Sequence, residues 1–379
     1  MDFSFTDEQE ELRRVLREFA QKELSPRYAE WDRTGTFPRE PWRRLGELGV
    51  TGLTVSEAYG GAGLGPVEAG IAAEEIARGD FNCAYAVVLG GLVGGILERH
   101  GSDVVREKYL VPMARGTRVV GIAVTEAEAG SDVAAIRTRA EPTGAGVRVF
   151  GEKTGISLAM AGDAFVVLAR TPGEGERPGF SAWLVPADAP GFSRQPFDDA
   201  GNRPIGRGTL FFDGVDLGPE YRLGADGEGL RIILASFDLS RVLIALQCLG
   251  AAAASLDETR EWVGRRRAFG RALADFEAVS FRLARHYATL ETLRWYCYRA
   301  LWLRQEGRPH TVEAAVCKWL APRAAFEAIH DALLLHGQYG YTKDLPFEQR
   351  LRDVMGLEIG DGTREVQELI VARHLLGRR

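Results

Sequence analysis

The chain has few cysteines, and none of them lies in a metal-binding or disulfide pattern. Its four cysteines, Cys83, Cys248, Cys297 and Cys317, are far apart in a sequence of 379 residues and lie in apolar or helical contexts. No C-x-x-C spacing occurs, so the sequence predicts neither a zinc site nor a disulfide framework. We therefore expect reduced, buried thiols and no bound metal.

A long apolar run and an excess of positive charge are also missing. No uninterrupted apolar stretch reaches the roughly 20 residues of a membrane-spanning helix. The start of the chain, Met1 to Asp7, has neither the basic residues nor the apolar run of a secretory signal. The formal net charge of −6 disfavours nucleic acid and acidic membrane surfaces as partners. The expected location is the cytoplasm, without membrane insertion.

The composition is that of a globular protein, with 45% hydrophobic and 26% charged residues. A chain of 379 residues is long for a single core, and we see no repeat or low-complexity segment. The residue pattern changes twice along the sequence, from helical periodicity to short apolar runs between turns and back to helical periodicity. We therefore predict an N-terminal helical domain over 1–120, a middle β domain over 121–226 and a C-terminal helical domain over 227–379.

Local patterns support this division. Thr6-x-x-Gln9 is a capping box, and apolar residues then recur at steps of three and four, as one buried helix face requires. The middle third has short apolar runs at 164–169 and 181–185 between Gly, Pro and Asp turns, which are typical of strands. Amphipathic helices are predicted from Val279 to Arg304 and from Val312 to Leu335.

The most informative stretch is AVTEAEAGSDVAA, from Ala123 to Ala135. Thr125 and Ser131 supply hydroxyls that can donate or accept, while Gly130 lets the backbone approach a ligand closely. Read by itself, the stretch is also compatible with a polar turn after an apolar run. It resembles, without a mismatch, the first signature of the acyl-CoA dehydrogenase family, and similar blocks recur in family order from Phe5 to Gly377.

The resemblance implies an α+β fold with an N-terminal helical domain, a middle β-barrel-like domain and a C-terminal four-helix bundle. It also implies bound FAD, an acyl-CoA substrate and an electron-transferring flavoprotein as electron acceptor. A homotetramer is expected, with a dimer as the minimum. Thr125 would bond the pyrimidine edge of the flavin, Ser131 the acyl-CoA and the edge of the cofactor site, and Ser157 the region near flavin N5.

The segment from Arg352 to Arg373 resembles the family's closing segment, in which a Glu before Gly-Thr removes the α-proton of the substrate. Asp361 holds that position here, and Ser240 holds a second position that a minority of members use for the base. A hydroxyl cannot serve as that base near neutral pH, so Asp361 is the predicted base. The resemblance also implies that the backbone N–H of Asp361 bonds the thioester oxygen. The alternative is that Asp361 only caps the last helix.

Further positions follow from the same resemblance. Phe237, Asp238 and Arg241 match the pantetheine-binding helix, although an Asp and an Arg three residues apart also form an ordinary ion pair. Arg266 resembles the arginine that reaches across a subunit interface to the FAD diphosphate, for which its fork of donors is suited. By itself, the run of arginines there is typical of a solvated helix end. The remaining predicted cofactor residues are Phe269, Gly337, Gln338, Thr363 and Glu365.

Departures from the family pattern bear on the acyl group. Gly155 and Gly360 stand where the family commonly has aromatic residues, and Gly91 lies in a glycine-rich stretch that resembles the wall of the acyl pocket. Together with Gly362 they are predicted to border the substrate. These positions suggest a wide, short pocket, and the resemblance implies that Asp as base goes with alicyclic thioesters, so we expect a cyclic or bulky acyl group such as cyclohexanecarboxyl. The plainer interpretation is that these glycines serve helix packing or a strand bulge, and that the pocket takes a linear or branched chain.

Three other functions remain open on the sequence. A flavin oxidase of the same fold, such as a nitroalkane oxidase, would also use Asp as base, but it would need no CoA-binding helix. The acyl group could arrive on a carrier protein instead of CoA. A non-catalytic homologue is the third alternative, and the intact 123–135 block speaks against it.

Overall fold

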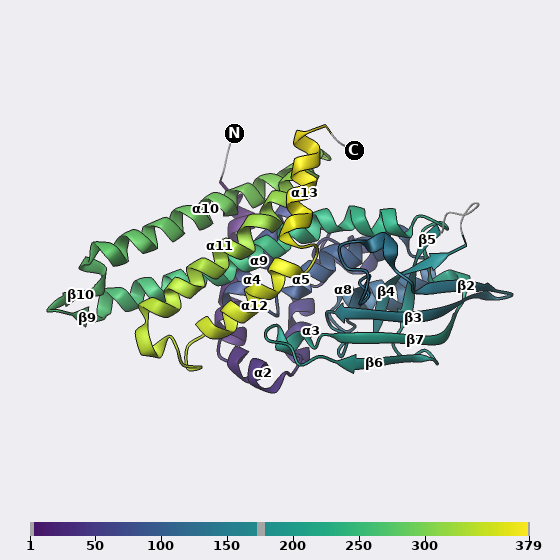
Figure 1. Ribbon diagram of the computed structural model, residues 1–379, viewed down its shortest axis with the longest axis horizontal. Coiled ribbons are helices and arrows are strands. Elements are labelled where there is room, and N and C mark those ends of the chain that lie inside the picture. Colours follow the sequence, from purple (N-terminus) through teal and green to yellow (C-terminus); the bar gives the residue numbers. More distant parts are fainter. Residues whose placement is uncertain (1–3, 173–178, 378–379) are drawn as a thin grey trace.

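The computed structural model describes residues 4–172 and 179–377. A helical N-terminal region is followed by a β-sheet region and then by a long helical bundle (Figure 1). The sheet lies at one end of the elongated bundle, and the N-terminal helices lie against the middle of the bundle and beside the sheet (Figure 1). The predicted α+β architecture is confirmed.

The N-terminal region begins with the predicted capping box. The Thr6 hydroxyl accepts from the backbone N–H of Gln9, and the Gln9 side chain accepts from the backbone N–H of Thr6. Because both ends of the first turn are satisfied, the helix starts at a defined residue. The α-helices here are α1 (Asp7–Phe19), α2 (Tyr28–Thr34), α3 (Arg39–Glu47), α4 (Pro66–Gly79), α5 (Tyr85–Leu89), α6 (Gly95–His100), α7 (Asp103–Val105) and α8 (Val111–Ala114).

The middle region is one sheet with the strand order β6-β7-β3-β2-β4-β5-β8, and β1 pairs with β4 in parallel. Both predicted apolar runs are strands, and they pair antiparallel along their whole length. The strands are β1 (Val120–Ala123), β2 (Arg139–Thr143), β3 (Gly146–Ile156), β4 (Ala164–Thr171), β5 (Gly179–Pro186), β6 (Phe192–Pro196), β7 (Gly208–Leu217) and β8 (Arg222–Leu223).

The C-terminal region consists of α9 (Gly229–Arg265), α10 (Glu277–Gln305), α11 (Thr311–Leu335), α12 (Phe347–Ile359) and α13 (Arg364–Leu375), with a short hairpin of β9 (Arg267–Ala268) and β10 (Arg271–Ala272) after α9. The two amphipathic helices predicted here are confirmed as α10 and α11. α9 is apolar and long enough to cross a membrane, but 78% of its most apolar window is buried inside the fold. It therefore acts as the central core helix.

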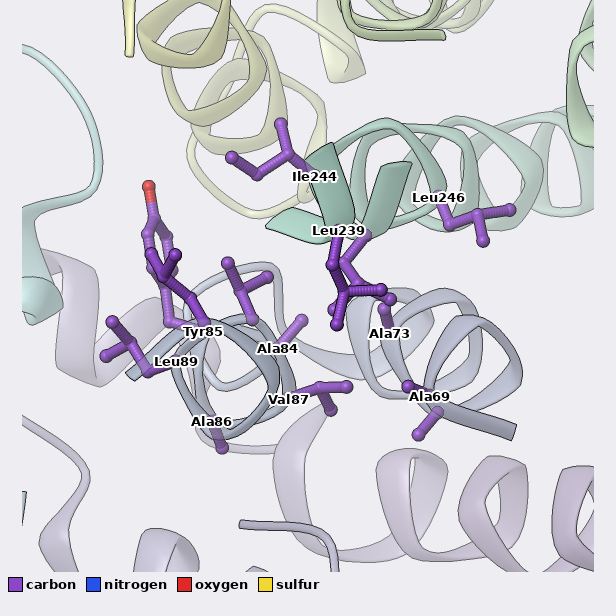
Figure 2. Close-up of a cluster of buried hydrophobic side chains, with 14 of the residues drawn as sticks. Ala69, Ala73, Ala84, Tyr85, Ala86, Val87, Leu89, Leu239, Ile244 and Leu246 are labelled. Carbon is purple, nitrogen blue, oxygen red and sulfur yellow. The ribbon is translucent and has the colours of Figure 1, made fainter. Parts of the chain in front are cut away.

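The main core joins α4 and α5 to α9 (Figure 2). Leu239 and Leu246 of α9 face Ala73 and Ala69 of α4, whose small side chains let the helices approach closely. Tyr85 begins α5 at the edge of this cluster, and its hydroxyl points away from the apolar side chains (Figure 2). The core thus presents one phenol toward the neighbouring C-terminal helices.

Candidate active site

Asp361 lies in the tight loop between α12 and α13. Its backbone has φ +56°, a left-handed conformation that Asp and Asn tolerate better than most residues. Thr363 is the N-cap residue of α13, with φ −62° and ψ 166°. The alternative in which Asp361 merely caps this helix is therefore wrong, because Thr363 has that position and the Asp361 carboxylate is bonded elsewhere.

The partner of the Asp361 carboxylate is Ser240 of α9. The Ser240 hydroxyl donates to Oδ2 of Asp361 at 2.7 Å, and Ser240 has no exposed surface. The sequence had indicated only that Ser240 occupies a position where it cannot act as base. The two residues are 121 positions apart, so no local pattern could predict this contact.

Two buried polar side chains hold the backbone of the same loop. Lys318 of α11 donates from Nζ to the carbonyl oxygen of Gly362 at 3.2 Å, and Gln367 donates from Nε2 to the carbonyl oxygens of Asp361 and Gly362 at 3.3 and 3.2 Å. Burial lowers the pKa of Lys318, and the nearby Asp361 carboxylate opposes that effect. Sequence analysis missed both residues, although a lysine within the apolar face of a helix was the available signal.

Tyr85 completes the surroundings of Asp361. Burial raises the pKa of the Tyr85 phenol, and the charge of Asp361 raises it further. Arg207, directly before β7, acts on the same phenol in the opposite direction. Its guanidinium lies 3.3 Å from where a Cβ would stand on Gly155 of β3. The charges of Asp361 and Arg207 thus both act on the Tyr85 phenol, and neither Tyr85 nor Arg207 is predicted from the sequence.

The predicted flavin-binding hydroxyls lie at one end of the sheet. Thr125 follows β1, and its carbonyl oxygen accepts from the backbone N–H of Thr154 in β3, while Ser157 follows the end of β3. Within residues 4–172 and 179–377, the hydroxyls of Thr125, Ser131 and Ser157 form no hydrogen bond. Open hydroxyls along one edge fit the polar rim of a flavin ring, which needs donors and acceptors there.

A buried ion pair fixes the 123–135 loop beside this edge. Lys153 of β3 has no exposed surface and donates to the Val124 carbonyl oxygen at 2.8 Å and to Glu126 Oε1 at 2.9 Å. Glu126 also accepts from the backbone N–H of Thr138 at 2.9 Å. Burial lowers the pKa of Lys153 to about 8, and Glu126 counteracts it. The loop that carries Thr125 is thus tied to the sheet on both sides.

Gly155 has a backbone reason for its identity. Its φ is +67°, and the register of β3 against β7 shifts between Lys153 and Ile156. This is a bulge in which a side chain would be strained. The plainer interpretation of Gly155 is confirmed, so its lack of an aromatic ring does not by itself indicate a wider pocket.

The glycine-rich stretch 90–95 is also explained by packing. A Cβ on Gly91 would lie 3.0 Å from Leu239 and 3.2 Å from Leu243, and one on Gly90 would lie 2.6 Å from the Thr51 carbonyl oxygen. Gly91 is therefore buried against α9, and its lack of a side chain lets the 90–95 stretch pack closely on that helix. Gly360 differs, because a Cβ there would meet only Leu357 and the Gly356 carbonyl oxygen at 3.5 and 3.7 Å. Of these glycines, Gly360 is the one with room beside it.

The predicted pantetheine residues form the ion pair that was their alternative explanation. Arg241 donates from Nη1 to Asp238 Oδ1 at 3.1 Å, and Thr311 donates to Asp238 Oδ2 at 2.6 Å. Phe237 is half-buried beneath the Arg241 guanidinium, whose carbon lies 5.9 Å from the ring centroid. The Nε of Arg241 is buried without a partner in the described part of the chain. Contact with CoA stays a prediction for these residues.

The remaining cofactor positions fall into two groups. Thr363 and Glu365 lie at the start of α13, and the Glu365 N–H and the Thr363 hydroxyl lower the pKa of the Glu365 carboxyl. Arg266 and Phe269 lie beyond the far end of α9, where the β9–β10 hairpin is remote from the sheet (Figure 1). One chain does not bring this second group to Thr125 and Ser157.

The far group has its own local structure. Trp262 of α9 stacks on His336 with ring centroids 5.0 Å apart, which places the α9 end beside Gly337 and Gln338. Gly337 has φ +62°, and both it and Gln338 are exposed. Phe269 is 96% exposed at the hairpin turn. Such an exposed aromatic side chain is suited to contact another molecule.

Three models of one protein family match the chain: "Acyl-CoA dehydrogenase, N-terminal domain" over residues 6–117, "middle domain" over 121–215 and "C-terminal domain" over 227–376. The chain is 35% identical to the short-chain specific acyl-CoA dehydrogenase of Clostridium acetobutylicum, covering 98% of this chain and 99% of that protein. It is 34% identical to the benzylmalonyl-CoA dehydrogenase of Aromatoleum aromaticum, covering 99% of this chain and 100% of that protein.

Solved structures agree with these relatives. Butyryl-CoA dehydrogenase from Megasphaera elsdenii superimposes with a TM-score of 0.95 at 32% identity, over 99% of this chain and 100% of that one. PigA, whose solved structure contains FAD, superimposes with a TM-score of 0.94 at 25% identity over 99% of both chains, and the open hydroxyls near the ends of β1 and β3 fit such a cofactor. The chain therefore belongs to the acyl-CoA dehydrogenase family and is an FAD-dependent oxidoreductase that acts on acyl-CoA thioesters.

Proposed function

We propose that Asp361 removes the α-proton of an acyl-CoA and that the β-hydrogen leaves as hydride, which gives an α,β-unsaturated thioester. The observation that carries this proposal is the environment of Asp361. Its carboxylate is half-buried, bonded to Ser240 through Oδ2, and followed by a loop that Lys318 and Gln367 hold in place. A carboxylate held near apolar helices is suited to general-base work at carbon.

FAD, when bound, supplies the acceptor for the hydride. Thr125, Ser131 and Ser157 would hold its flavin and the neighbouring thioester, because their hydroxyls are free at one sheet edge. The backbone N–H of Asp361 would donate to the thioester oxygen. A donor there stabilises the negative charge that develops when the α-proton leaves.

The acyl group is proposed to be cyclic or bulky, of the cyclohexanecarboxyl type. Two observations support a wide pocket near the base: the absence of a side chain at Gly360, where a Cβ would make only ordinary van der Waals contacts, and the similarity to a benzylmalonyl-CoA dehydrogenase. The second candidate is a short linear or branched acyl group. It is favoured by the packing role of Gly90 and Gly91 and by the similarity to short-chain and butyryl-CoA dehydrogenases.

Phe237, Asp238 and Arg241 are proposed to bind the pantetheine arm. The buried, unpartnered Nε of Arg241 supports this assignment, because a buried donor without an acceptor is costly unless a ligand supplies one. A role for these residues argues for CoA over a carrier-protein thioester and against a nitroalkane oxidase, which needs no such helix.

Arg266, Phe269, Gly337 and Gln338 are proposed to contact the FAD of a neighbouring copy, with Thr363 and Glu365 contributing at the near end. The exposure of Phe269 and the distance of the β9–β10 hairpin from the sheet support this arrangement. A homotetramer in the cytoplasm, with an electron-transferring flavoprotein as acceptor, completes the proposal.

The experiment is an anaerobic titration of the FAD-loaded protein with cyclohexanecarboxyl-CoA, benzylmalonyl-CoA, butyryl-CoA and a branched acyl-CoA, and with a nitroalkane. Flavin absorbance reports reduction. We expect bleaching by at least one acyl-CoA and none by the nitroalkane. Faster reduction by butyryl-CoA than by the cyclic thioester would replace the bulky substrate with a short one. Reduction by the nitroalkane alone would refute the dehydrogenation, and no reduction by any compound would favour a non-catalytic homologue.

A further inference from the structure

We propose that Ser240 is a positioning residue for Asp361: its hydroxyl anchors Oδ2 of the carboxylate and leaves Oδ1 to receive the substrate's proton. This inference rests on the proposed role of Asp361 as base. Ser240 transfers no proton. The proton moves from the substrate's α-carbon to Oδ1 of Asp361, and the Ser240 hydroxyl keeps its own proton.

The geometry supports a strong anchor. The 2.7 Å distance from Ser240 Oγ to Asp361 Oδ2 joins a neutral donor to a charged acceptor, and Ser240 is fully buried, so water does not compete. In the described part of the chain Oδ1 of Asp361 has no hydrogen-bond partner. One oxygen is therefore held and the other is available for a proton.

A second acceptor is within reach of the same hydroxyl. The carbonyl oxygen of Phe237 lies 3.1 Å from Ser240 Oγ. A hydroxyl has one proton, so it donates to the charged and closer carboxylate while Asp361 is ionised. Once Asp361 carries the proton on Oδ1, Oδ2 remains an acceptor, and the hydroxyl can donate to it or to the Phe237 carbonyl oxygen. Ser240 can thus stay bonded in both protonation states.

The backbone explains why an anchor is needed. Asp is about 1.5 Å shorter than the family's usual Glu, and Asp361 has a left-handed backbone conformation that sets the direction of its side chain. Lys318 and Gln367 bond only to backbone carbonyl oxygens of this loop. Lys318 and Gln367 therefore fix the backbone from which the Asp361 side chain starts, and Ser240 fixes the position of its carboxylate.

Other ionisable groups face the same carboxyl, and the test must keep them unchanged. Lys318 of α11 and Tyr85 of α5 interact with Asp361 directly. Behind them, Glu358 of α12 and Arg241 of α9 act on Lys318, and Arg207 and Asp353 act on Tyr85. Removing the Ser240 oxygen leaves this set intact, so a change in titration reports one hydrogen bond.

The experiment compares Ser240→Ala with Ser236→Ala. Ser236 is on the same helix, one turn earlier, and its hydroxyl donates only to the Ile232 carbonyl oxygen. Alanine suits a helix interior, so both variants are expected to fold. Two readouts are used: the pH dependence of anaerobic flavin reduction, and infrared titration of the Asp361 carboxyl, assigned by its absence in Asp361→Asn.

Loss of a donor to a carboxylate disfavours its charged form. In Ser240→Ala, the ascending limb of the pH–rate profile and the carboxyl titration should both move to higher pH by about one unit, and the rate below that limb should fall about tenfold. The KM for the acyl-CoA should stay near the wild-type value. Ser240→Thr, which keeps a hydroxyl, should restore the profile, and Ser236→Ala should match the wild type.

An unshifted limb and titration in Ser240→Ala, with Asp361→Asn inactive, would overturn the positioning role and leave the base assignment standing. If Asp361→Asn kept normal turnover, the base assignment would fail. The infrared titration would then still decide whether Ser240 holds the carboxyl, because it does not depend on catalysis.

Discussion

Two positions on helix α9 lie in opposite environments: Ser240, in the first half of the helix, and Arg266, directly after its last residue. At Ser240 every polar contact is made within the chain, and the hydroxyl is buried against Asp361. At Arg266 the side chain is exposed, and the adjacent hairpin presents Phe269 with 96% of its surface exposed. The same helix therefore carries a buried contact made within the chain in its first half and leads to an open surface at its C-terminal end.

The difference separates what one chain can do from what needs a second molecule. The residues around the base come from four helices of a single copy, α5, α9, α11 and α13, so the geometry around Asp361 should not change when residues on the exposed hairpin are mutated. The hairpin end has only local contacts within the chain, such as Phe269 against Phe276 and Arg266 over Trp262, and a ligand or a partner copy would add to them. Four experiments can break or sharpen this comparison.

The largest expected effect is at the buried contact between Ser240 and Asp361. Asp361→Asn should slow anaerobic flavin reduction by about 10²–10⁴-fold, because a positioned base contributes that much. Asn tolerates the left-handed backbone at this position, so the loop and the bound FAD should be retained. Stopped-flow absorbance measures the rate, and flavin content serves as the control. Near-normal reduction in this variant would remove Asp361 from the mechanism.

A buried polar cluster joins α12, which precedes the Asp361 loop, to the N-terminal and middle regions. Asp353 of α12 accepts from the backbone N–H of Asn202 at 2.6 Å and from the Asn82 side chain at 3.0 Å. Burial raises the pKa of Asp353 to about 7 and that of neighbouring Asp80 to about 6. Unfolded carboxyls titrate near 4. The folded state thus binds more protons between about pH 4 and 7, so stability falls as the pH rises through this window.

Asp353→Asn should weaken this dependence of stability on pH. The free energy of unfolding of the variant minus that of the wild type should be larger at pH 8 than at pH 5 by about 2–4 kcal/mol. An amide flip of Asn82, whose Oδ1 lacks a partner, would satisfy the new side chain. Urea unfolding at both pH values measures the difference, and an equal effect of the mutation at pH 5 and pH 8 would contradict the shifted titration.

At the open end, Arg266→Ala should weaken FAD binding by about tenfold, because a charge-assisted bond to a diphosphate is lost. Fluorescence titration of the apoprotein measures the affinity, and Arg265→Ala, which removes the adjacent exposed arginine, is the matched control. Mixed oligomers of Arg266→Ala and Asp361→Asn should regain activity, since one site then has both residues. Failure of the mixture, with wild-type FAD affinity in Arg266→Ala, would argue against a contact between copies.

The smallest effect is expected at the sheet edge that the flavin would face. Gly155→Ala should destabilise the protein by about 1 kcal/mol, because its left-handed φ disfavours a side chain. Gly144→Ala, which places a Cβ in open space, should be close to neutral. Thermal unfolding compares the two, and equal midpoints would show that the bulge at Gly155 relaxes without cost.

Local patterns predicted what depends on neighbouring residues. The capping box at Thr6, the strands at 164–169 and 181–185 and the helices α10 and α11 follow from spacing alone. Motifs in the sequence also placed Asp361 next to a helix start. The contact with Ser240 could not be predicted, because 121 residues separate the two side chains. The glycines at 90–91 looked like pocket wall but are set by the approach of Leu239 and Thr51, which only the fold reveals.

Exchange of the substrate's α-hydrogen with solvent tests the central claim most directly. Phenylacetyl-CoA has α-hydrogens but no β-hydride to lose, so proton removal can be followed in D₂O without turnover. We predict that mass spectrometry detects deuterium at the α-carbon with wild-type protein and only background exchange with Asp361→Asn. Equal exchange in both proteins, with equal thioester binding, would contradict the assignment of Asp361 as the base.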